Sequence, residues 1–143
     1  MPTTAPPVEA DAVIIGAGPG GIASAHLLQQ KGIHDFVIVD RGDDFGGTWR
    51  DNHYPGLAVD IPSLWYQLSF APNPDWSRFF APGPEIYAYL RDTADKLGLR
   101  PHLRAGAEVL RQHEGLSAKA ARLRAIYTTG SDAVIPTAKE NEA

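Results

Sequence analysis

The fold is decided by AVIIGAGPGGIASAHL, residues 12–27, in which a short apolar run is followed by a cluster of glycines and then by a helical pattern. Residues 12–15 predict a buried strand, because four consecutive apolar residues end at a glycine. Residues 20–31 predict a helix, because apolar residues recur there at helical spacing and Gly32 is a typical helix end.

A second short apolar run, FVIV at residues 36–39, predicts another strand, which ends at Asp40. A strand, a glycine turn, a helix and a strand form a β-α-β unit, whose crossover places the two strands in parallel. The sequence therefore predicts an α/β fold that starts as a Rossmann-like parallel sheet.

The glycine cluster Gly16-Ala17-Gly18-Pro19-Gly20-Gly21 has the GxGxxG spacing of a dinucleotide site, directly after a strand and at the start of a helix. The first glycine permits the tight turn, the second lets the backbone approach a pyrophosphate, and the third lets helix and strand pack closely. The phosphates would meet the positive end of the helix.

Asp40, at the end of the second strand, is placed to accept a hydrogen bond from a ribose hydroxyl. Its charge would repel a 2′-phosphate, so the site should not prefer NADP. The motif alone leaves both FAD and NAD open. The cofactor-binding residues expected from it are Gly16, Gly18, Pro19, Gly20, Gly21 and Asp40.

The rest of the chain is less regular. Residues 41–82 are rich in glycine, proline and aromatic residues, and a long irregular segment in a compact domain is usually functional. Residues 84–97 predict a helix that ends at Gly98. Residues 104–112 and 123–129 predict strands.

Composition excludes several classes of function. The chain has 143 residues, a net charge of −4 and no cysteine, which argues against disulfides and against nucleic acid or an anionic membrane as a partner. No apolar run approaches the ~20 residues of a membrane span. The five histidines lack metal-ligand spacing, so we expect no metal site. We expect a cytoplasmic protein.

The segment FGGTWRDNHYPGLAVD, residues 45–60, resembles the signature that follows the first β-α-β unit in Baeyer–Villiger and related flavin-containing monooxygenases. Tyr66 and the motifs SF, PDWS and PEI further along occur in the same order as in that family. The resemblance covers residues 11–108, and it implies that the glycine loop binds FAD.

The resemblance also implies site residues. Thr48 and Trp49 would lie along the flavin, Val109 would contact the adenine through its backbone, and Asp60 would lie near the junction of flavin and nicotinamide. Asp60 is the one catalytic candidate, with a role in proton transfer; the alternative is a turn cap, because Ile61-Pro62 follows it. The cofactor-binding residues implied by the resemblance are Arg41, Gly47, Thr48, Trp49, Asp60, Tyr66 and Val109.

In this family NADPH reduces the flavin, and the reduced flavin uses O₂ to oxygenate a ketone, an amine or a sulfide. The cofactor carries that chemistry and the protein orients it. The NADPH site would lie outside this chain, because the sequence contains no second GxGxxG.

We therefore expect a truncated FAD-binding domain at residues 11–135, inactive alone, between a disordered leader at 1–10 and a disordered tail at 136–143. The alternatives are a non-catalytic FAD-binding module that needs a partner chain and a remnant without function. An incomplete sheet would also favour association through its open edge.

Two groups of side chains have plainer interpretations. Trp65 and Trp76 are expected to be core aromatics, while Arg50, Arg78 and Arg91 are expected to be solvated charges.

Overall fold

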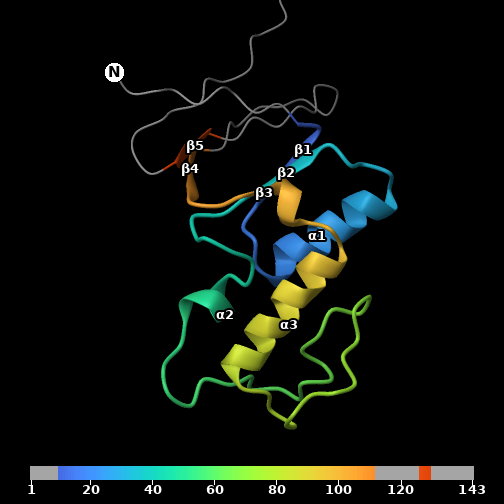
Figure 1. Cartoon of the computed structure of the whole chain (residues 1–143), viewed down its shortest axis with the longest axis vertical. Coiled ribbons are helices and arrows are strands. Elements are labelled where there is room, and N and C mark those ends of the chain that lie inside the picture. The colour runs from blue at the N-terminus through green and yellow to red at the C-terminus, as the bar shows by residue number, and fades with distance from the viewer. Residues whose placement is uncertain (1–9, 112–125, 130–143) are drawn as a thin grey trace, which may run out of the picture.

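The computed structural model describes residues 10–111 and 126–129 (Figure 1). The predicted tail and all of the predicted leader except Ala10 lie outside these residues, as do Gln112 and residues 123–125 of the predicted strands. Ala10 is buried against the sheet.

The β-α-β unit predicted from the glycine cluster is confirmed. Strand β1 (Ala12–Ile15) and strand β2 (Phe36–Val39) run in parallel, with Ala12 opposite Phe36 and Ile15 opposite Val39. Helix α1 (Pro19–Gln30) connects them and begins with a proline, which lacks the N–H that a first-turn residue leaves unpaired.

A third parallel strand extends the sheet on the far side of β2. The short 3-10 helix η1 (Arg100–His102) leads into β3 (Leu103–Arg104), and the strand order is β1-β2-β3. The α/β fold class with a Rossmann-like start is therefore confirmed.

The single strand predicted over residues 104–112 is instead two strands. The chain turns at Gly106, which has a φ of +66° that favours glycine. Strand β4 (Ala107–Arg111) then pairs antiparallel with β5 (Ile126–Thr129) in a separate two-stranded sheet.

Strand β2 is buried on both faces, as is typical of a parallel sheet. Its alternate residues serve two cores, because side chains along a strand point to opposite faces. Phe36 and Ile38 pack into the larger core with the helices. Val37 and Val39 pack with Ala107 on the other face, where β4 lies.

The larger core is formed by α1 and by helix α3 (Gly83–Lys96), which lie side by side (Figure 1). The predicted buried stripe of α3 is confirmed at Ile86, Leu90 and Ala94, whereas Leu97 is only partly buried. The helix is shifted by one residue from the predicted 84–97.

The segment between β2 and α3 contains one short helix, α2 (Thr48–Asp51), and otherwise irregular chain. The interpretation of Trp65 as a core residue was wrong, since it is 77% exposed, whereas Trp76 packs against the core. In the part of the chain that the structure describes, no helix is long and apolar enough to cross a membrane.

Candidate functional site

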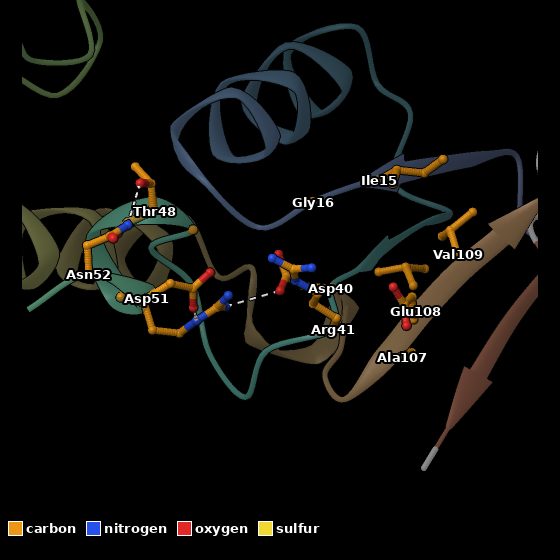
Figure 2. Close-up of a pocket in the computed structure, with 13 residues that line it drawn as sticks. Ile15, Gly16, Asp40, Arg41, Thr48, Asp51, Asn52, Ala107, Glu108 and Val109 are labelled. Carbon is orange, nitrogen blue, oxygen red and sulfur yellow. Dashed lines mark hydrogen bonds and ion pairs between the residues drawn. The ribbon is translucent and has the colours of Figure 1, made fainter. Parts of the chain in front are cut away.

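A cavity of about 650 Å³ lies at the carboxyl ends of β1 and β2. This is where open parallel sheets bind their ligands, and the size falls within the roughly 300–1,000 Å³ of small-molecule sites. Figure 2 shows that its walls come from the turn after β1, the end of β2, α2 and β4. The lining residues include Gly16, Asp40, Thr48, Arg50, Asp51 and Val109.

The turn after β1 leaves open space above its backbone. Gly16 has a φ of +98°, and a Cβ atom placed on it would meet nothing within 4 Å. Its N–H donates to the carbonyl of Val39 at 2.8 Å, which fixes the turn against β2. Gly21 is different, because its Cβ would lie 1.9 Å from the carbonyl oxygen of Gly16. Any side chain at Gly21 would push the helix away from the turn.

The two glycine-rich segments of the chain pack against each other. A Cβ on Gly47 would lie 2.9 Å from the Cα of Gly18, and Gly47 has a φ of +55°. The N–H of Gly46 donates to the carbonyl of Ala17 at 2.9 Å. The close approach of backbones therefore places α2, which starts at Thr48, at the rim of the cavity.

Asp40 is 9% exposed and is held by three donors. Its Oδ2 accepts from the N–H of Ala17 at 2.7 Å. Its Oδ1 accepts from the N–H of Gly42 at 2.7 Å and from Nη1 of Arg50 at 3.1 Å. Asp40 thus joins the glycine turn to the loop after β2 and to α2.

The interpretation of Arg50 as a solvated charge was wrong. Its side chain is 9% exposed and lies in the cavity wall. Besides Asp40, it donates from Nε to Oδ1 of Asp51 at 2.8 Å and from Nη1 to the carbonyl of Asp44. The hydrogen bond to Asp51 and the charge of Asp40 raise the pKa of Arg50 against the opposing effect of burial, so it stays a cation.

The predicted residues fall into two groups. Those that line the cavity are Gly16, Asp40, Arg41, Gly47, Thr48 and Val109. Those that do not line it are Gly18, Pro19, Gly20, Gly21, Trp49, Asp60 and Tyr66. The glycines and Pro19 of the second group still form the turn and the first turn of α1 at the edge of the cavity.

Trp49 and Tyr66 form a pair outside the cavity. The indole Nε1 donates to the Tyr66 hydroxyl oxygen at 3.0 Å, and the rings meet edge to face at 5.5 Å. Asp60 is exposed. Thr48 is fixed by Asn52, whose Nδ2 donates to its hydroxyl at 2.9 Å.

Comparison with known proteins agrees with the Rossmann-like fold. The family model described as an NAD(P)-binding Rossmann-like domain matches residues 14–82. A Baeyer–Villiger monooxygenase of Streptomyces coelicolor is 54% identical over 98 residues, covering 68% of this chain and 19% of that protein. The chain is related to the Baeyer–Villiger monooxygenases.

Solved structures are also similar to this chain. An FAD-bound form of OTEMO matches with a TM-score of 0.67 at 37% identity, over 76% of this chain and 21% of that one. An oxidized steroid monooxygenase bound to NADP matches with a TM-score of 0.66 at 35% identity, over 70% of this chain and 20% of that one. The chain thus spans about one fifth of the length of the monooxygenases that it matches.

One element of the cavity wall was missed from the sequence, namely α2 with Arg50. A four-residue helix is too short to show a period. The sequence feature that could have predicted the burial of Arg50 is its position near the acidic Asp40 and Asp51. The glycines around it let chain segments approach closely.

Proposed function

We propose that the cavity binds FAD and that the chain is the FAD-binding portion of an NADPH- and O₂-dependent flavoprotein monooxygenase. The observation that carries the proposal is the open space above Gly16, next to the buried carboxylate of Asp40. A turn without a side chain suits a pyrophosphate, and a fixed carboxylate suits a ribose.

The described residues fit the group. The turn from Gly16 to Gly21 and the amino end of α1 would hold the pyrophosphate, since unpaired N–H groups and the helix dipole attract phosphate. Asp40 would accept from the adenosine ribose. Arg41 and Val109 line the same space and would contact the adenosine half.

The flavin half would lie towards α2. Thr48 lines the cavity and Trp49 follows it in the same helix. Tyr66 is joined to Trp49 by a hydrogen bond, and the two would lie together along the part of the flavin that extends beyond the cavity. Asp60 is exposed and is proposed to hold or release a proton near the nicotinamide.

Bound FAD would supply the transfer of electrons from NADPH to O₂ and the oxygenation of a ketone, an amine or a sulfide. The chain covers only about one fifth of the length of its relatives, so this activity and these substrates are proposed for a protein that also contains the remaining parts. A cytoplasmic location remains a prediction from the absence of cysteine.

A second candidate function is an FAD-binding module that does not turn over alone. It is favoured by the sequence, in which only one GxGxxG occurs and no second fingerprint is present for NADPH. NADPH consumption by the purified, FAD-loaded chain separates the two candidates. Oxidation of NADPH supports catalysis by the chain itself, and no oxidation supports the module.

The FAD proposal is tested by equilibrium titration of the purified chain with FAD, and with NAD⁺ and NADP⁺ as comparators. Quenching of flavin fluorescence reports FAD binding directly. We expect saturable binding of FAD at one site per chain and weaker binding of both nicotinamide dinucleotides. If NAD⁺ binds as tightly as FAD or more tightly, the cavity is an NAD site and the FAD proposal is wrong.

A further inference from the structure

We propose that Arg50 is a positioning residue of the nucleotide site, which orients Asp40 so that it accepts a hydrogen bond from one ribose hydroxyl. The inference rests on the proposed binding of an adenine dinucleotide in the cavity. It assigns a role to Arg50 that the glycine motif and the expected cofactor residues leave open.

Asp40 has few free acceptor positions. A carboxylate has about four, two on each oxygen. Oδ1 accepts from the N–H of Gly42 and from Arg50, so both of its positions are taken. Oδ2 accepts only from the N–H of Ala17 among the described donors. One position on Oδ2 is left, which suits one hydroxyl and not two.

Three donors hold the carboxylate of Asp40 in its orientation. The N–H groups of Ala17 and Gly42 belong to two different turns, and each contacts a different oxygen. Arg50 adds the only cation hydrogen-bonded to Asp40 among the described residues. Arg50 joins two opposite charges and fills the second acceptor position of Oδ1, so it restricts the carboxylate beyond what the two N–H groups do.

Arg50 is itself held in place by its neighbours. Its guanidinium is fixed by Asp51 and by the carbonyl of Asp44. It also lies directly over Gly42, where a Cβ atom would be 2.0 Å from the central guanidinium carbon. A side chain at Gly42 would therefore displace Arg50, although Gly42 itself does not line the cavity.

The consequence is a coupling between Arg50 and the ribose hydroxyl. Without the cation, Asp40 keeps its two N–H donors but loses its third contact, so we expect the free position on Oδ2 to be held less firmly for a hydroxyl in the cavity that Asp40 lines. Loss of Arg50 should therefore reduce the difference in affinity between a nucleotide with the 2′-hydroxyl and one without it, in addition to any loss of overall affinity.

The test measures ADP and 2′-deoxy-ADP as competitors of FAD, with the wild-type chain and Arg50→Met. A hydrogen bond to a charged group is worth enough to favour ADP by about tenfold in the wild type. In Arg50→Met we expect the preference for ADP over 2′-deoxy-ADP to fall below about threefold. A discrimination that stays at the wild-type value in Arg50→Met, or a wild type without discrimination, overturns the inference.

Two further variants keep the inference testable if Arg50→Met does not fold. Gly42→Ala keeps Arg50 but displaces it, and should reduce the discrimination as Arg50→Met does. Arg50→Lys keeps the charge without the planar guanidinium, so its preference for ADP should lie between those of the wild type and Arg50→Met. Full discrimination in folded Gly42→Ala and Arg50→Lys overturns the inference, with folding checked by thermal unfolding.

Arg91→Met is the matched control. Arg91 also pairs with an aspartate, Asp44, at 3.0 Å, but it lies outside the cavity wall. Its variant should discriminate as the wild type does. A wild-type chain that binds neither FAD nor ADP overturns the proposed function and the inference together. If the wild-type chain binds both, and Arg50→Met still prefers ADP over 2′-deoxy-ADP as strongly as the wild type does, only the inference is overturned.

Discussion

Gly18 and Gly47 approach each other so closely that a Cβ atom on Gly47 would lie 2.9 Å from the Cα of Gly18. They come from the two glycine-rich segments of the chain, the turn after β1 and the residue before α2. The contact connects the expected pyrophosphate turn to the expected flavin side of the site.

Gly47→Ala should destabilise the chain by roughly 1–3 kcal/mol and weaken FAD binding, because it adds backbone strain at φ +55° and a clash with Gly18. Thermal unfolding and FAD titration measure the two effects. Gly56→Ala is the control, since Gly56 has a φ of +83° and open space around it. Equal losses of stability and of FAD affinity in the two variants would contradict a specific role for the contact.

Neighbouring glycines in α1 should respond in opposite directions. Gly21→Ala places a Cβ 1.9 Å from the carbonyl oxygen of Gly16 and should cost about 1–3 kcal/mol or more. Gly20→Ala meets nothing within 4 Å, and alanine favours a helix over glycine by up to about 1 kcal/mol. Urea unfolding of both variants checks the prediction, and a stable Gly21→Ala would refute the packing.

Tyr66→Phe removes the acceptor of the Trp49 indole N–H and should destabilise the chain by about 0.5–1.5 kcal/mol. If the pair lies along the flavin as proposed, the absorption spectrum of bound FAD should also shift. Tyr54→Phe is the control, because Tyr54 is 60% exposed. An unchanged FAD spectrum in Tyr66→Phe would remove Tyr66 from the proposed site.

Acid should weaken the contact between Arg50 and Asp51. The hydrogen bond from Arg50 lowers the pKa of Asp51 below its ordinary value of 3.8. A lowered folded-state pKa means that the contribution to stability is present above pH 3.8 and is lost as the pH falls through the lowered value. Asp51 is 43% exposed, so we expect less than about 1 kcal/mol.

Urea unfolding at neutral pH and at about pH 2.5 measures this contribution. Asp51→Asn should show a smaller loss of stability between the two conditions than the wild type. Asp43→Asn changes an exposed aspartate of the same segment and serves as the control. A loss in Asp51→Asn as large as that of the wild type would contradict the prediction.

The β-α-β unit and α3 could be predicted because their periodic apolar residues form one continuous core. Residues 104–112 were harder, because Gly106 divides an otherwise strand-like run and a glycine in such a run has several outcomes. The exposure of Trp65 could not be read from its type, since burial depends on which segments cover it.

Part of the candidate site could also be predicted from the sequence, and part could not. Gly16 and Asp40 were predicted to lie together, and the structure places both in the cavity wall, because a known turn geometry links the carboxyl ends of β1 and β2. The burial of Arg50 could not be predicted, since it depends on a short helix that is fixed by contacts between distant glycines.

The most direct test of the account is whether the chain retains FAD. The purified chain would be incubated with excess FAD, desalted and scanned in the visible range. We predict a flavin spectrum at close to one FAD per chain, with the retained amount reduced in Gly47→Ala. A soluble, folded chain that leaves the column without flavin would contradict the claim that the cavity at the ends of β1 and β2 is an FAD site.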